Sequence, residues 1–343
     1  MALSPINRHK LVLHCHGKTM SAPNRLIRQL FYSGLLIWGA LTLIACAATP
    51  QKSTTAVSQD HPAALFYPSA NQNQRIRFVI IHYTAGNWQQ SLLALTKQSE
   101  RPVSSHYLIP QTGDASYPID KPLQIYQLVS EQHRAWHAGE SSWQDRQQLN
   151  DQSIGIELVN ESHCEFTPGI SAVQVSEQLC LTPDFDPAQL LLLENLLQDI
   201  LQRYPDITPD RVLAHSDVSP QKKQDPGSRF PWQWLASRGI GAWYDAVDLN
   251  KFWQQPLLAA ERIAQWQWAL QRYGYGIDVT GVLDPQSQFV LLAFQRHFVP
   301  EQIDGQPNRK TLAVLTALLA KYQAKSLQQL KQTVIPVENN PVK

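Results

Sequence analysis

The sequence has little charge and no excess of either sign. Charged residues make up 17% of its 343 residues, and the formal net charge is +1. Such a chain has no broad basic field that would attract nucleic acid, and we expect no nucleic-acid partner. Apolar residues make up 43%. Most of the chain can therefore bury a core, and its length allows two domains and a linker.

The N-terminal region lacks an apolar run long enough to cross a bilayer comfortably. Its apolar stretch, Gly34–Ala45, follows two arginines and fits the h-region of a signal peptide. The letters LIAC at 43–46 resemble a bacterial lipobox, in which Cys46 is lipidated and becomes the mature N-terminus. Ala47 stands where an aspartate would signal inner-membrane retention, so we expect a lipid anchor on the periplasmic face of the outer membrane. An ordinary signal peptide or an anchor helix is the alternative.

Cysteine is also scarce, with four in the chain. Cys15 lies ahead of Met20, which is an alternative start of the protein, and Cys46 would carry the lipid. Cys164 and Cys180 remain, both in a polar segment that is typical of a loop. In an oxidising periplasm such a pair favours a disulfide bond, and two free thiols are the alternative.

The pattern of apolar residues divides the rest of the chain into two regions. Between 61 and 250, short apolar strands alternate with helices, which predicts an α/β fold with a central mixed β-sheet flanked by helices. The clearest helix follows Asp186, with apolar residues at helical spacing up to Tyr204. The expected segments are a signal peptide over 1–45, a lipidated N-terminus and tether over 46–60, the α/β domain over 61–250, a small all-α three-helix domain over 256–322, and a loose polar tail over 323–343.

The all-α region is predicted from three amphipathic segments, 257–276, 284–298 and 308–322. We expect these helices to fold separately from the α/β domain. Trp253 and Leu257 near the junction are apolar, however, and their burial against the α/β domain is the alternative.

Two histidines lie at the ends of predicted strands. His82 follows the apolar run 76–81, and His215 ends the strand in DRVLAHSD. In open α/β sheets the strand ends form the natural crevice for a site. Asp225 follows shortly after His215, before a Pro226–Gly227 turn that can bring its carboxylate back. Two imidazoles and a carboxylate suit Zn²⁺ with an open fourth position. The alternative for His82 is a histidine that caps the strand by bonding a nearby backbone group.

Glu157 and Lys223 are the candidate catalytic residues. Glu157 stands inside the apolar strand SIGIELVN. A carboxylate buried there without a partner would cost free energy, so its presence indicates a specific role. It is either a general base or a side chain that points out of an edge strand. Lys223 lies two residues before Asp225, so in an extended segment both side chains would share a face. Its ammonium could then stabilise an oxyanion, and a solvated surface charge is the alternative.

Other histidines compete for the role of metal ligand. His106 lies in the predicted strand SSHYLI, and we interpret it as a structural histidine. His137 lies in AWHAG, next to Trp136. We expect His137 and Trp136 to line the substrate cleft, with metal binding as the alternative for His137.

Five segments that carry these residues occur in order along the chain: VIIHYTAG, SSHYLI, WHAG, SIGIELVN and LAHSDVSPQKKQDPG. Over about 76–235 they resemble the zinc-dependent N-acetylmuramoyl-L-alanine amidases of the type-2 family, which share a fold with peptidoglycan recognition proteins. The segment 161–185 looks like an insertion relative to that family. The resemblance implies one Zn²⁺ held by His82, His215 and Asp225, with Glu157 and Lys223 carrying the chemistry.

The region 256–322 resembles the small three-helix peptidoglycan-binding domain. Together with the lipobox, the chain resembles the outer-membrane lipoprotein amidases of Gram-negative bacteria. The resemblance implies hydrolysis of the amide between N-acetylmuramic acid and L-alanine, with peptidoglycan or muropeptides as partners. We expect a monomer attached to the membrane through its lipid. A non-catalytic peptidoglycan receptor of the same fold and a zinc peptidase that cuts within the stem peptide are the alternatives.

Overall fold

The computed structural model describes residues 64–65, 67–164 and 180–334. The expected signal peptide, Cys46 and the whole of the expected tether lie outside this range. All the elements described below lie in one compact unit that begins at Ala70. Within the described residues, no helix has the length and apolar character needed to cross a membrane.

The main sheet of the described residues has five strands and mixed direction, which confirms the predicted fold class. β1 pairs in parallel with both β6 and β9, β2 pairs in parallel with β6, and β3 runs antiparallel to β2. The strand order is β3 (Tyr126–Gln127), β2 (Tyr107–Ile109), β6 (Ser153–Leu158), β1 (Phe78–Tyr83) and β9 (Val212–Ala214).

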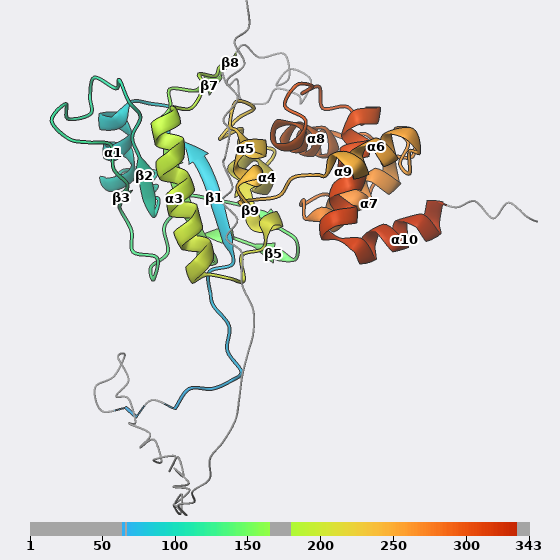
Figure 1. Cartoon of the computed structure of the whole chain (residues 1–343), viewed down its shortest axis with the longest axis horizontal. Coiled ribbons are helices and arrows are strands. Elements are labelled where there is room, and N and C mark those ends of the chain that lie inside the picture. The colour runs from blue at the N-terminus through green and yellow to red at the C-terminus, as the bar shows by residue number, and fades with distance from the viewer. Residues whose placement is uncertain (1–63, 66, 165–179, 335–343) are drawn as a thin grey trace, which may run out of the picture. The chain divides into compact units, whose positions relative to one another are not determined.

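The central strands are apolar along nearly their whole length because both faces of the sheet are covered. In β1 every residue from Phe78 to His82 is buried, as expected for a parallel strand between two layers. Figure 1 shows α3 lying along one face of this sheet. The helices are α1 (Trp88–Thr96), α3 (Pro187–Arg203), α4 (His215–Val218), α5 (Trp232–Ser237), α6 (Ala246–Gln254), α7 (Ile263–Tyr273), α8 (Pro285–Phe298), α9 (Arg309–Tyr322) and α10 (Ala324–Val334).

Helix α3 forms where the sequence predicts it. The Asp186 side chain accepts a hydrogen bond from the Ala188 N–H, and Pro187 occupies the first turn. Leu193, Leu197 and other apolar residues at helical spacing then pack against the strands. The helix is therefore fixed both by its N-cap and by the apolar face it buries.

The expectation of a loose tail after 322 is wrong for its first part. Residues Ala324–Val334 form α10, and Leu327 and Leu330 are buried in the same core as α7 and α9. Two leucines three residues apart lie on one face of a helix, so burial of that face stabilises an otherwise polar segment. The remaining residues of the tail lie outside the described range.

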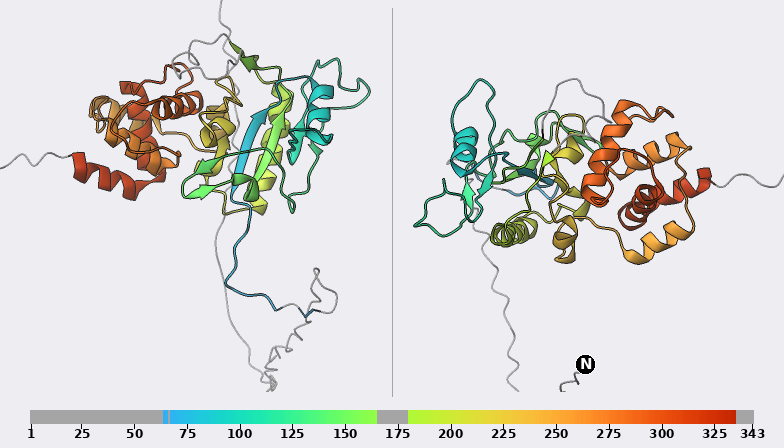
Figure 2. Two further views of the ribbon diagram at one scale, coloured as in Figure 1. Left: turned by 180° about the vertical axis from the view of Figure 1, so that it is seen from behind. Right: turned by 90° about the horizontal axis from the view of Figure 1, so that it is seen from above.

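The helices α6–α10 do not form a core of their own. Figure 2 shows them, in orange to red, as one group of helices. Phe78 from β1, Leu213 from β9 and Val218 from α4 belong to the same buried cluster as Phe294 and Phe298 of α8. The alternative of packing against the α/β domain therefore describes this structure.

The two junction residues named from the sequence behave differently. Leu257 is partly buried against the shared cluster. Trp253 is 38% exposed, and its ring lies 4.6 Å from the guanidinium of Arg309 in α9. Most of the interface is thus built by residues that are distant in sequence from the junction.

Because the core is shared, we predict that a chain ending at Asp245 will not fold like the complete protein. Removal of α6–α10 exposes Phe78, Leu213 and Val218, and each large apolar side chain returned to water costs about 1.5–3 kcal/mol. A thermal melt should show a strongly lowered transition or none. A cooperative transition close to that of the full chain would contradict the shared core.

The backbone brings the cysteine pair together. In the antiparallel hairpin of β7 (His163–Cys164) and β8 (Cys180–Leu181), Cys164 lies directly opposite Cys180. Facing residues in antiparallel pairs have Cα atoms about 4.5–5.5 Å apart. Disulfides join Cα atoms about 4.4–6.8 Å apart. The register is therefore compatible with the expected bond.

We predict a Cys164–Cys180 disulfide in protein that has been kept under oxidising conditions. It would close a segment of about 15 residues, which the chain-entropy model values at roughly 3 kcal/mol. Thiol labelling of denatured, non-reduced protein should leave both cysteines unlabelled, whereas a Cys164→Ser variant should expose one reactive thiol. Labelling of both cysteines in the unmutated protein would exclude the bond.

Candidate active site

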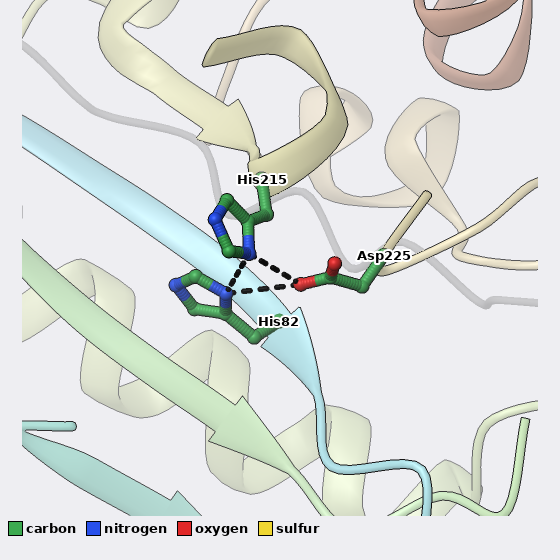
Figure 3. Close-up of side chains that lie close together, drawn as sticks. All are labelled: His82, His215 and Asp225. Atoms are coloured by element: carbon green, nitrogen blue, oxygen red, sulfur yellow. Dashed lines mark hydrogen bonds and ion pairs between the residues drawn. The ribbon is translucent and has the colours of Figure 1, made fainter. Parts of the chain in front are cut away.

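Two histidines and an aspartate meet at the end of the sheet where the parallel strands β1 and β9 finish. His82 is near the end of β1, and His215 begins α4 directly after β9. These strands are parallel neighbours, so their carboxyl ends lie at the same edge. Asp225 reaches the same place from the loop after α4. Figure 3 shows the three side chains pointing toward one another.

The geometry of this cluster is compact and buried. The Nδ1 atoms of His82 and His215 are 3.0 Å apart, and each lies 3.0 Å from Oδ2 of Asp225. The exposed fractions of the three residues are 1%, 3% and 8%. Among the described residues, this is the group identified as able to hold a metal ion.

A chain of hydrogen bonds determines which nitrogen of His82 carries the proton. The Ser153 hydroxyl donates to the Leu149 carbonyl at 2.6 Å, so its oxygen accepts from Nε2–H of His137 at 3.2 Å. His137 Nδ1 then carries a lone pair and accepts from Nε2–H of His82 at 3.1 Å. His82 Nδ1 is therefore left with a lone pair that points at the cluster.

His215 is oriented in the same sense by the backbone. Its Nε2 lies 3.3 Å from the Ala138 carbonyl, to which it must donate. Its Nδ1 therefore also presents a lone pair to the cluster. Support of the second ring nitrogen by a backbone carbonyl or a side chain is the usual arrangement around a metal-binding histidine.

The electrostatics of the site favour neutral imidazoles beside an ionised carboxylate. Burial and the neighbouring His215 lower the pKa of His82 to about 4. Burial and His82 hold the pKa of His137 well below its ordinary value. For Asp225 burial alone would raise the pKa, but His215 and His82 outweigh it and lower the pKa. These are the protonation states that metal ligands require.

Glu157 lies beside this cluster. It is paired in register with His82 on the neighbouring strand, and β6 lies between β2 and β1 in the sheet. The edge-strand alternative for Glu157 is therefore wrong. Its Oε2 atom is buried and has no hydrogen-bond partner within the described part of the chain. Burial and then Asp225 raise the pKa of Glu157 well above its ordinary value, while Lys223 opposes the shift.

A cavity of about 260 Å³ gives access to these residues. Lys223 lines it, whereas the adjacent Lys222 forms an ion pair with Glu140 outside it. Trp136 also lines the cavity and is 49% exposed, as expected for a residue at the edge of a cleft. The cavity is lined by His82, Tyr83, Thr84, Ala85, Val103, Ser104, Trp136, His137, Glu157, His215, Lys223 and Asp225.

The structure changes the interpretation of His137 and adds Tyr83. His137 borders the cavity, but both its ring nitrogens are used by His82 and Ser153, so it supports a ligand. Tyr83 also lines the cavity, and burial followed by Asp225 raises the pKa of its hydroxyl to about 12. Its hydroxyl is protonated at neutral pH, as that of an unshifted tyrosine also is, so it can donate a hydrogen bond in the cavity. The sequence contains no signal for this role, because neighbouring residues of a strand ordinarily face opposite sides of the sheet.

Gly155 and His106 explain how the His137 ring and strand β2 pack closely against β6. A Cβ atom on Gly155 would come within 2.4 Å of the His137 ring, so only glycine allows that ring to lie over β6. His106 is buried, and its Nδ1 accepts from the Gly155 N–H at 3.0 Å, while its Nε2 faces the His133 carbonyl at 3.2 Å. The structural interpretation of His106 is confirmed.

Comparisons with known proteins agree with this geometry. Residues 72–228 match the family model described as N-acetylmuramoyl-L-alanine amidase. Residues 259–315 match the one described as a putative peptidoglycan binding domain. The chain is 39% identical over 302 residues to N-acetylmuramoyl-L-alanine amidase AmiD of Escherichia coli (strain K12), covering 86% of this chain and 99% of AmiD.

Solved structures give the same result. AmpDh3 from Pseudomonas aeruginosa, in complex with anhydromuramic pentapeptide, is 39% identical with a TM-score of 0.66, covering 75% of this chain and 96% of its own. E. coli AmiD, in complex with anhydro-N-acetylmuramic acid-L-Ala-D-gamma-Glu-L-Lys, is 38% identical with a TM-score of 0.62, covering 75% of this chain and 93% of its own. From its site, its fold and these relatives, the chain belongs to the N-acetylmuramoyl-L-alanine amidase family.

Proposed function

We propose that the protein is a zinc-dependent amidase that hydrolyses the bond between N-acetylmuramic acid and L-alanine in peptidoglycan or its fragments. The observation that carries the proposal is that three lone-pair atoms converge beside the buried Oε2 atom of Glu157, which has no hydrogen-bond partner among the described residues. The substrate is inferred from the relatives, since AmiD was solved with an anhydro-N-acetylmuramic acid peptide.

The donor set fits zinc. Without a cation, the lone pairs of His82 Nδ1 and His215 Nδ1 and the Asp225 carboxylate would repel one another at 3.0 Å. Ligand atoms about 2.0–2.1 Å from a tetrahedral Zn²⁺ are about 3.3 Å apart, close to this spacing. When bound there, zinc would lower the pKa of a water ligand to about 7 and polarise the scissile carbonyl.

Glu157 and Lys223 supply the remaining chemistry. Within the described part of the chain, Oε2 of Glu157 has no hydrogen-bond partner, and the pKa of the carboxyl is raised. Both features suit a group that takes a proton from water and returns it to the departing L-alanine amine. Lys223 lines the same cavity and provides positive charge for the oxyanion of the tetrahedral intermediate. Trp136 offers an exposed ring at the cavity for the sugar or the peptide.

Zinc binding is tested directly by removal of a ligand. We predict that His215→Ala protein loses most of its zinc, because two ligands remain and one face of the site opens. Metal analysis after purification measures it. The matched control is His163→Ala, since His163 is exposed and outside the cavity. Undiminished zinc in His215→Ala would remove His215 from the ligand set.

Glu157→Gln should keep zinc and the fold while turnover falls by about 10²- to 10⁴-fold, the usual cost of removing a general base.

Lys223→Ala should also lower turnover, and Lys222→Ala, which changes a lysine outside the cavity, is its control. Mass analysis of muropeptide digests measures both the rate and the bond that is cut. Products cut within the stem peptide would indicate a peptidase, and zinc-loaded protein without any product would indicate a receptor.

We also infer that the mature protein is anchored in the outer membrane through a lipid on Cys46. The support is the LIAC sequence at 43–46 after an apolar stretch, followed by Ala47. Metabolic labelling with a radioactive fatty acid should label the protein but not its Cys46→Ala variant. Equal labelling of both proteins would place the lipid elsewhere, and absence of label from both would contradict the anchor.

A further inference from the structure

The short helix α4 determines the position of two of the three metal-binding side chains. His215 is its first residue. The N–H of Ser216, the next residue, donates to the backbone carbonyl of Asp225 at 3.0 Å. A shift of this single turn would therefore move His215 directly and Asp225 through its backbone.

Asp217, in the same turn, is completely buried. Its Oδ2 accepts from the Ala214 N–H at 2.8 Å and so closes the turn from within. Its Oδ1 accepts from the Tyr275 hydroxyl at 2.6 Å, and its Oδ2 also accepts from Nδ1–H of His297 at 2.7 Å. Tyr275 follows α7 and His297 belongs to α8, so both donors come from the region that resembles a peptidoglycan-binding domain.

The two donors are held rigidly. Tyr275 and His297 are 1% and 2% exposed. The His297 ring lies between Trp232 of α5 and Phe298, with ring centroids 3.9 Å away on each side and nearly parallel planes. His297 cannot turn away from Asp217 without breaking this packing. The Tyr275 ring is held separately, by Trp143 at 4.8 Å and Phe294 at 6.1 Å between ring centroids.

Helix α8 contacts the other end of the ligand segment as well. Arg296, next to His297, is 7% exposed and donates to the side chain of Gln224 at 3.3 Å. Gln224 directly precedes Asp225. The same helix therefore contacts the segment from Ala214 to Asp225 both at its α4 turn and beside its last residue.

We propose that Tyr275 and His297 are positioning residues of the metal site, acting through Asp217 on His215 and Asp225. The helical region is then a structural part of the catalytic centre and not only an anchor on the cell wall. This inference rests on the proposed zinc site. Loss of a hydrogen bond made directly to a metal ligand costs about 10- to 100-fold in metal affinity, and a smaller effect is expected here because Tyr275 and His297 act one residue further from the metal.

The chain offers a matched control for Tyr275. Tyr273 is equally buried and lies two residues away, but its hydroxyl has no hydrogen-bond partner among the described residues. Tyr275→Phe removes a hydrogen bond to Asp217, whereas Tyr273→Phe removes a hydroxyl that makes none. For His297, Leu removes the donor, while Asn keeps an N–H near the place of Nδ1.

The experiment uses the full-length protein and measures the zinc dissociation constant by competition with a chelator. Tyr275→Phe and His297→Leu should bind zinc more weakly, by up to about 10-fold, the lower end of the loss seen for direct partners of metal ligands. Tyr273→Phe should match the unmutated protein, and His297→Asn should recover part of the loss. The visible spectrum of the Co²⁺-substituted protein should change in Tyr275→Phe and remain unchanged in Tyr273→Phe.

The outcomes separate this inference from the proposed function. If the unmutated protein binds no zinc, the proposed zinc site fails and the inference fails with it. If it binds zinc and Tyr275→Phe and His297→Leu bind it equally well with an unchanged Co²⁺ spectrum, the inference alone is overturned. A lowered melting temperature with unchanged zinc affinity also overturns it, because the contacts would then stabilise the fold only.

Discussion

Parallel pairing of β6, β1 and β9 is the constraint on which the site depends. Because these strands run in the same direction side by side, Glu157, His82 and the turn after β9 lie at one edge of the sheet. His82 and Glu157 face each other in register. A register shift of one residue would turn one of them to the opposite face of the sheet and separate the metal-binding group from the proposed base.

Burial then gives these side chains the protonation states that the proposed chemistry needs. Desolvation lowers the pKa of His82 and raises that of Glu157. The same effect on Asp225 is outweighed by its two histidine neighbours. The series from Ser153 through His137 to His82 directs the imidazole lone pair toward the metal position. It requires glycine at 155, where a Cβ atom would collide with the His137 ring.

The shared core changes the view of the C-terminal helices. A region attached only as an anchor would bury its apolar residues within itself. Here Phe78 and Leu213 of the sheet share one buried cluster with α7–α10. Asp217 accepts hydrogen bonds from Tyr275 and His297 across this interface. The helical region that matches a peptidoglycan-binding domain is thus physically connected, through one buried carboxylate, to the turn that carries His215.

The sequence by itself determined the elements that have a local signal. The apolar run before His82, the N-cap at Asp186 and the leucines of α3 predicted a strand and a helix that the structure contains. Strand ends marked His82 and His215, and an isolated carboxylate marked Glu157. The prediction of a loose tail after 322 was wrong because α10 is stabilised by tertiary packing, through burial of Leu327 and Leu330 in the cluster that includes α7 and α9. Only the tertiary structure decided the roles of His137, Tyr275 and His297, since their partners lie 55, 58 and 80 residues away. A local pattern describes which side chains are apolar or polar along one element, whereas a buried hydrogen bond between distant segments depends on how those elements pack.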